Sequence, residues 1–188
     1  MSKTQRLTRM SLLAAVSIVC IVLIQIPVIP AAPFLKYDMA DVPILLGAFM
    51  LGPVAGLEIL VAVSAIQAFF MGGDGIIGLL MHVIASGSLI CVACLVYNKM
   101  GKSTKSMILG LFAGSLTMTV MMIPLNLIFT SFFMGAPYDV VVSMLIPAII
   151  PFNLIKAGLN SLIFFFVYKS IKFIFKEKSD ISAPQFNK

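Results

Sequence analysis

The chain contains several apolar segments that are each long enough to cross a lipid bilayer, and this feature restricts the possible folds to membrane architectures. Residues 10–29, 76–97 and 107–134 are three such segments, because a transmembrane helix needs about 20 mainly apolar residues. The chain has 188 residues, of which 61% are hydrophobic, whereas soluble domains are roughly 45–50% apolar. The sequence therefore indicates an integral membrane protein, with residues 1–188 forming a single membrane domain.

A fourth apolar segment, residues 42–71, is too long for one regular span and is interrupted by Gly52 and Pro53. Proline suits the first turn of a helix, where its missing N–H group is no loss. We therefore expect a short helix at 42–51, a tight corner, and a full span at 53–71.

The last apolar segment contains Pro147 and Pro151 near its beginning, and we expect its helix at 145–172. The predicted fold class is an all-α membrane protein with six transmembrane helices, of which the second is short. A short helix is tolerated in a membrane where its end borders protein or a wet cavity instead of lipid.

Basic residues predict the orientation of these helices. With six spans, one face of the membrane receives Lys3, Arg6, Arg9, Lys99, Lys102, Lys105, Lys169, Lys172, Lys176, Lys178 and Lys188. The opposite face receives Lys36, Asp38, Asp41, Asp74 and Asp139. The positive-inside rule then predicts that both termini are cytoplasmic in a multi-pass protein of the cell membrane. Because the basic residues flank apolar segments and do not form a patch on a soluble domain, we expect no nucleic-acid partner.

Lys156 is the most informative polar residue, because it lies inside an apolar segment. An unpaired cation at the centre of a transmembrane helix costs from about 2.5 to over 10 kcal/mol, so such residues are functional-site candidates. Asn153 and Asn160 lie three residues before and four residues after Lys156 and share its helical face. We expect no acidic residue at this depth except near the mouth of the site.

Other polar residues are predicted to converge on the same outer layer, namely Asn126, His82, Asp41 and Gln67. An apolar pocket with a few placed polar groups suits a small-molecule ligand. The loop at 30–41, which contains Tyr37, is long enough to cap such a pocket. The alternatives are that Asn126 only links helices, that His82 and Gln67 only pack, and that Lys156 only forms a structural pair with a carboxylate or a backbone carbonyl.

The sequence has no recognisable energy source or catalytic centre. Residues 101–104 resemble the end of a phosphate-binding loop, but the glycine which that motif requires five residues earlier is Val96. We found no metal-ligand cluster and no nucleophile–base pair, so we expect a non-enzymatic binding protein that a partner supplies with energy.

Four sequence elements resemble the S components, the substrate-binding subunits, of energy-coupling factor (ECF) vitamin transporters. They are Tyr37-Asp38, Asp41-Val42-Pro43, the glycine–proline corner at 52–56, and Asn153-Leu154-Ile155-Lys156. The resemblance covers nearly the whole chain and is strongest to the riboflavin-specific members. It implies a protein that takes riboflavin as its transported ligand, needs no cofactor, and captures the vitamin from outside for ATP-driven uptake.

The resemblance also implies site residues and partners. In the riboflavin family the matching positions that contact the ligand are Asn126, Asn153 and Lys156, and we add Asn160, His82, Asp41 and Tyr37 as candidates. The expected partners, besides membrane lipid, are a transmembrane coupling subunit and two cytoplasmic ATPases. Small residues on the first helix would meet the coupling subunit, and their counterparts here are Ser11, Ala14 and Ala15. An S component for another vitamin, and a structural subunit without a ligand, remain the alternatives.

Overall fold

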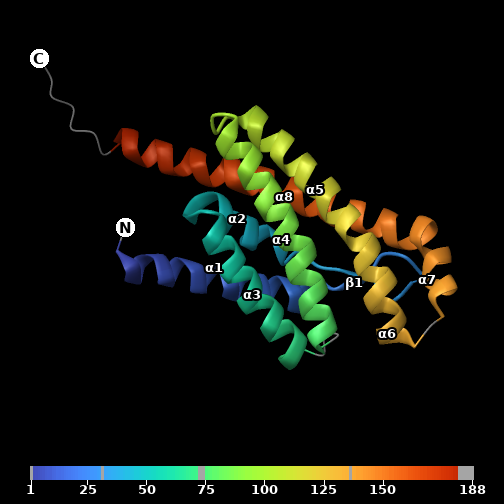
Figure 1. Cartoon of the computed structure of the whole chain (residues 1–188). Helices are drawn as coiled ribbons and strands as arrows, with labels where there is room; N and C mark the ends of the chain where they lie inside the picture. The colour runs from blue at the N-terminus through green and yellow to red at the C-terminus, as the bar shows by residue number, and fades with distance from the viewer. Residues whose placement is uncertain (1, 31, 72–74, 136, 182–188) are drawn as a thin grey trace, which may run out of the picture.

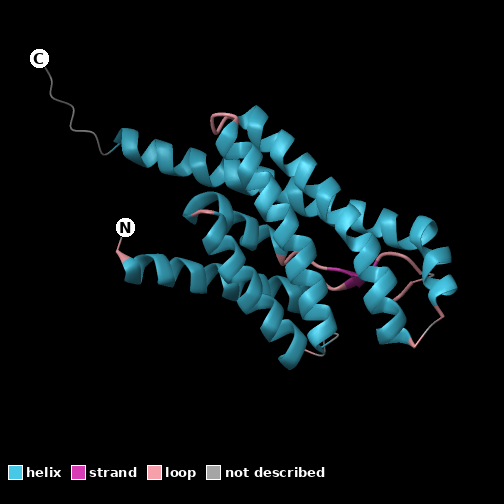
Figure 2. Cartoon of the chain, in the orientation of Figure 1, coloured by secondary structure: helices cyan, strands magenta, loops and turns pink. Residues whose placement is uncertain are grey.

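The computed structural model describes residues 2–30, 32–71, 75–135 and 137–181, and almost all of them are helical (Figures 1 and 2). The α-helices are α1 (Lys3–Leu23), α2 (Asp41–Leu51), α3 (Pro53–Phe70), α4 (Gly75–Lys99), α5 (Thr104–Leu125), α6 (Ser131–Met134), α7 (Tyr138–Met144) and α8 (Ile150–Ile181). Two π-helical turns, η1 (Asn126–Thr130) and η2 (Leu145–Ile149), lie within the last two helical segments. The strands β1 (Ile26–Pro27) and β2 (Lys36–Tyr37) pair antiparallel in the α1–α2 loop.

The six-helix membrane fold is confirmed. Five helical segments are long and apolar enough to span a bilayer, and α2 is a shorter apolar helix. The fourth and fifth of these segments are composite: one runs through α5 and η1, and the other runs through α7, η2 and α8. The beginning of α1, the turn between α4 and α5, and the end of α8 lie at one end of the molecule, and α6 and α7 lie at the other (Figure 1).

The corner between α2 and α3 has the form that the sequence indicates. Gly52 has φ +103°, a conformation that side-chain-bearing residues rarely adopt, and Pro53 opens α3. Gly56 lies directly against the backbone of Ala48, so α2 folds back closely along α3. The first eight residues of α2, Asp41 to Ala48, are all buried, and this short helix is therefore enclosed by protein.

Helix boundaries differ from the predicted ones for local reasons. Helix α1 begins at Lys3, because Ser2 and Gln5 form a capping box, and it ends at Leu23 instead of continuing to residue 29. Residues 24–29, which are apolar except for Gln25, form the start of the loop and strand β1. Apolar character alone does not distinguish a membrane helix from a loop that packs on the protein.

Glycines allow α4 and α5 to approach closely. A Cβ atom on Gly110 would lie 2.6 Å from the carbonyl oxygen of Ala93, and one on Gly114 would lie 2.7 Å from that of Leu89. Small residues at such crossings are a general feature of membrane helix packing. This contact sets the position of α4, which carries His82, relative to α5 and its extension η1, which carries Asn126.

An aromatic cluster closes the core at the end of the molecule where α1 begins and α8 ends. The ring of Phe49 in α2 lies 4.9 Å from that of Tyr97 in α4 and 4.8 Å from that of Phe164 in α8. Tyr168 packs on the same group, 5.5 Å from Phe164. Phe164 is two turns beyond Lys156, or about 12 Å along the helix. Any pocket at the level of Lys156 is therefore closed on this side and lies toward the α1–α2 loop.

Candidate functional site: a polar pocket under the α1–α2 loop

The candidate site is a cavity of about 340 Å³ between the α1–α2 loop and helices α3, α4, α5 and α8. Its apolar wall includes Phe34, Met81, Met118, Met122 and Phe152. Its polar lining consists of Gln25, Lys36, Asp38, Ser64, Gln67, His82, Asn126, Thr130, Asn153 and Lys156. The cavity has the size and composition of a small-molecule site.

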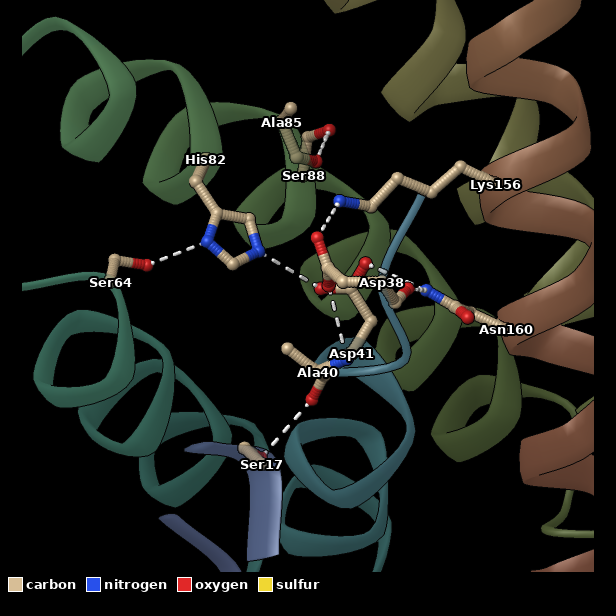
Figure 3. Close-up of polar contacts among 10 residues, drawn as sticks. All are labelled: Ser17, Asp38, Ala40, Asp41, Ser64, His82, Ala85, Ser88, Lys156 and Asn160. Atoms are coloured by element: carbon tan, nitrogen blue, oxygen red, sulfur yellow. Dashed lines mark hydrogen bonds and ion pairs between the residues drawn. The ribbon is translucent and has the colours of Figure 1, made fainter. Parts of the chain in front are cut away.

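Lys156 forms a buried ion pair with Asp38. The Lys156 Nζ atom donates to Asp38 Oδ2 at 2.8 Å, which joins α8 to the α1–α2 loop (Figure 3). A pairing of Lys156 with a carboxylate is one of the expected alternatives, and it occurs here because the loop folds back into the bundle after β2 and carries Asp38 inward. The pair neutralises two charges that would each be costly if buried alone.

The position of this loop is stabilised by three residues outside the cavity lining, namely Tyr37, Asp41 and Asn160. The Tyr37 hydroxyl donates to Asn160 Oδ1 at 3.0 Å, and Asn160 Nδ2 donates to the Asp38 carbonyl at 3.1 Å and to Asp41 Oδ2 at 3.2 Å. Burial, and then the charge of Asp38, raise the pKa of the Tyr37 phenol, so that it remains a protonated donor. These three predicted site residues do not line the cavity. Their contacts position Asp38.

His82 links α3 to the beginning of α2. Its Nδ1 atom lies 2.9 Å from Ser64 Oγ, and its Nε2 atom lies 3.3 Å from Asp41 Oδ1 (Figure 3). If Nε2 carries the proton, both contacts are satisfied by a neutral imidazole that accepts from Ser64. This serine–histidine pair has no signal in the sequence, because Ser64 is an ordinary residue of an apolar helix. Asp41 also accepts a hydrogen bond from Asn160. This series of hydrogen bonds therefore connects α3, α4, α2 and α8.

Asn126 lies in one π-helical turn and Asn153 bonds to the last residue of the other, and such turns are frequent at functional sites. Asn126 begins η1, where its Nδ2 donates to the Met122 carbonyl at 2.8 Å and its Oδ1 accepts from Thr130 Oγ1 at 2.9 Å. Asn153 follows η2, and its Nδ2 donates to the Ile149 carbonyl at 2.7 Å. The Asn153 Oδ1 atom is buried and has no hydrogen-bond partner in the described part of the chain.

The buried oxygen of Asn153 is a hydrogen-bond acceptor that the cavity offers to a ligand. A buried acceptor without a partner is costly, and this atom belongs to a residue that lines the cavity. A ligand with an N–H or O–H group at this position would satisfy it. Lys156 uses one of its three N–H donors for Asp38 and can offer another. The pocket therefore suits a ligand whose edge presents both a donor and an acceptor.

The predicted interface residues lie on α1, the least enclosed span. In the most apolar 18-residue stretch of α1, only 11% is buried inside the protein, whereas the corresponding share in the other four long spans is 33–39%. Ser11 and Ala15 are exposed and share one face, whereas Ala14 is half-buried and packs against the core. The face with Ser11 and Ala15 also exposes Leu12, Val19 and Val22.

Comparison with known proteins places the chain in a family. The profile described as "ECF transporter, substrate-specific component" matches residues 5–168. The chain is 30% identical to the riboflavin transporter RibU of Staphylococcus aureus, with 91% of this chain and 92% of that protein aligned. It is 29% identical to RibU of Streptococcus thermophilus over 93% of this chain and 86% of that protein. The riboflavin transporter FmnP of Bacillus subtilis is 25% identical over 74% of this chain and 77% of that protein.

The fold agrees with a solved structure of the same class. That structure, described as the S component of a bacterial ECF transporter, superposes with a TM-score of 0.81 and 32% sequence identity. The alignment covers 93% of this chain and 99% of the solved chain. The protein is a multi-pass membrane protein and a transporter component, not an enzyme. The chain belongs to the family of substrate-specific components of ECF transporters.

Proposed function

We propose that this protein binds riboflavin from the extracellular side of the cell membrane and presents it to an ATP-driven ECF complex. The observation that carries the proposal is the pocket containing Lys156, Asn153 and Asn126, in a chain whose aligned relatives are named riboflavin transporters. The isoalloxazine ring of riboflavin is flat, and its pyrimidine edge alternates carbonyl groups with an N–H group. The N–H group of this edge complements the Asn153 acceptor, and its carbonyl groups complement the Lys156 donor.

Different residues of the pocket are suited to the two parts of riboflavin, the flat ring and the ribityl chain. Lys156 would donate to a ring carbonyl, and Asn153 Oδ1 would accept from the imide N–H group. Met81, Met118 and Met122 would pack on the ring, since thioethers adapt well to aromatic surfaces. Gln25, Ser64, Gln67 and His82 would face the hydroxyl groups of the ribityl chain. In this arrangement Tyr37, Asp41 and Asn160 act through Asp38, as positioning residues.

The basic residues suggest the orientation of the protein in the membrane. They flank the end of the molecule where α1 begins and α8 ends, so the positive-inside rule favours cytoplasmic termini and an outward-facing loop. The exposed face of α1 with Ser11 and Ala15 is available for a coupling subunit, because small residues permit close helix approach. Two cytoplasmic ATPases would then supply the energy for uptake.

A fluorescence titration tests the ligand directly. Detergent-purified protein, freed of any yellow co-purified ligand, is expected to quench flavin fluorescence saturably at about one riboflavin per chain. Parallel titrations with other vitamins distinguish an S component of another specificity. A folded, monodisperse sample that gives a flat response to riboflavin would remove this vitamin from the proposal, and a flat response to all of them would favour a structural subunit.

Replacing Asn153 by alanine is expected to weaken riboflavin binding by about 10- to 100-fold and to lower stability by about 1 kcal/mol. The lost ligand hydrogen bond corresponds to about 1–3 kcal/mol, and the lost stability reflects the hydrogen bond from Nδ2 to the Ile149 carbonyl. Riboflavin titration and thermal unfolding measure the two quantities separately. Thr117→Ala is the matched control, because it removes a hydroxyl that bonds only to its own helix and does not line the cavity. An unchanged dissociation constant in Asn153→Ala would contradict the assigned role.

A further inference from the structure

A second cavity lies on the outer surface of the bundle, away from the polar pocket. It has a volume of about 450 Å³ and lies between α5 and α8. Its rim is formed by exposed apolar side chains, namely Ile108, Phe112, Leu116, Leu154, Leu162 and Phe166. In a membrane-spanning bundle such a rim faces the hydrocarbon region of the bilayer.

Gly158 produces the depth of this groove. A Cβ atom built on Gly158 would meet no atom within 4 Å, in contrast to Gly110 and Gly114 at the α4–α5 contact. The floor beside it is formed by Ser115 and Ser161, whose hydroxyl oxygens lie 3.1 Å apart. Ser115 also donates to the Ala157 carbonyl at 3.4 Å. Because these hydroxyls are bonded to the protein, the groove presents an apolar surface without unmet polar groups.

The groove has the length of one leaflet of the bilayer. From Leu154 to Phe166, α8 rises about 18 Å at ~1.5 Å per residue, and half of the hydrocarbon core is about 15 Å thick. Helices α5 and α8 run antiparallel here, since Ser115 contacts Ala157 and Ser161. The groove therefore extends from the middle of the membrane toward the end of the molecule that carries the chain termini.

Each of the two helices carries a lysine toward that end. Lys105 lies one turn before Ile108 on α5, and Lys169 lies one turn beyond Phe165 and Phe166 on α8, so both share the groove face. The Lys169 Nζ atom lies 5.9 Å from the centre of the Phe165 ring, and Phe165 lines the groove. Residues 104–125 and 150–176 contain no acidic residue. The mouth of the groove is therefore positively charged.

We propose that this groove binds an anionic phospholipid of the cytoplasmic leaflet. One acyl chain lies over Gly158 between α5 and α8, and the phosphate group pairs with Lys105 and Lys169. This rests on the orientation proposed above, in which the positive-inside rule makes this end of the molecule cytoplasmic, and anionic lipids of that leaflet attract basic residues. The site is independent of the polar pocket and of the identity of the transported vitamin.

Native mass spectrometry of the full chain tests the acyl-chain site, with phosphatidylglycerol added to delipidated protein. The wild-type protein is expected to retain one phosphatidylglycerol molecule. Gly158→Phe fills the groove and is expected to reduce the retained fraction about tenfold, the effect of excluding roughly two methylene groups from apolar contact. Val120→Phe is the matched control, because Val120 is exposed on α5 but does not line the groove. Equal retention by Gly158→Phe and Val120→Phe, with both proteins folded by circular dichroism, would overturn the proposal.

The headgroup site is tested with a second lipid that has the same acyl chains. Wild-type protein is expected to prefer phosphatidylglycerol over phosphatidylcholine, and Lys169→Gln to reduce that preference by about fivefold. Lys3→Gln on α1 removes the same charge away from the groove and should leave the preference unchanged. Equal binding of both lipids by the wild-type protein would refute the anionic headgroup. Detection of a lipid-free dimer that Gly158→Phe dissociates would identify a second copy of the chain as the occupant instead.

Discussion

Replacing Lys156 by methionine is expected to abolish high-affinity riboflavin binding and to destabilise the protein by about 3–5 kcal/mol. The variant leaves the buried Asp38 carboxylate without its partner at 2.8 Å, and breaking a buried ion pair from one side has a cost of this size. It also removes the proposed donor to the flavin ring. Flavin fluorescence titration and thermal unfolding in detergent measure the two effects. Lys36→Met is the control, since Lys36 also lines the cavity but is exposed.

A double variant separates ligand contact from charge neutralisation. In Lys156→Met combined with Asp38→Asn both members of the ion pair are replaced by neutral side chains, so most of the lost stability is expected to return. The amide introduced at position 38 can still accept from the Ala40 N–H group, as Asp38 Oδ1 does at 3.1 Å. If Lys156 contacts riboflavin, binding stays weak in the stable double variant. Recovery of binding would mean that Lys156 serves only to neutralise Asp38, and the proposed ligand contact would have to be abandoned.

Replacing Gly110 by leucine is expected to destabilise the bundle by about 3 kcal/mol or more, because overpacking at a contact with backbone forces the helices apart. Even the Cβ atom would lie 2.6 Å from the Ala93 carbonyl oxygen. Gly158→Leu is the matched control on the neighbouring helix, where the same side chain meets open space and leucine is the better helix former. Its stability is expected to stay within about 1 kcal/mol of the wild type.

Thermal unfolding of both glycine variants in delipidated detergent samples compares these sites. Separation of α4 from α5 would also move His82 relative to Asn126, so Gly110→Leu is expected to weaken riboflavin binding along with stability. Equal melting temperatures for Gly110→Leu and Gly158→Leu would show that the α4–α5 crossing tolerates separation, contrary to the geometry at Gly110.

Part of the site followed from spacing within a single helix. Asn153, Lys156 and Asn160 share a face of α8 because of the 3.6-residue helical repeat, and this inference required no knowledge of other helices. Two of these residues line the cavity, whereas Asn160 lies behind it and bonds to Asp38 and Asp41. Lys156, which faces the ligand, and Asn160, which positions the loop, are about one helical turn apart. Which of them reaches the cavity depends on where the loop enters the bundle.

Other residues of the site are hard to identify from the sequence. Ser64 and Thr130 are short hydroxyl residues in apolar helices, where such residues are common, and only their distances to His82 and Asn126 identify them. The π-helical turns beside Asn126 and Asn153 adjoin segments with prolines, but a proline is also compatible with a kink or an ordinary first turn. The form adopted depends on packing against neighbouring helices.

The membrane class, the number of helices, the corner at Gly52 and Pro53, and the presence of a costly cation at Lys156 can all be inferred from the amino-acid sequence. These features follow from segment length, local backbone preference and the free energy of burying charge, all of which act within short stretches of chain. The folded structure is needed to see that Asp38 neutralises Lys156 across 118 residues of chain, and that Gly110 lies at a helix crossing while Gly158 opens a groove. Membrane helices are apolar on every side, so their sequences carry little information about which face meets which neighbour, and long-range contacts set that choice.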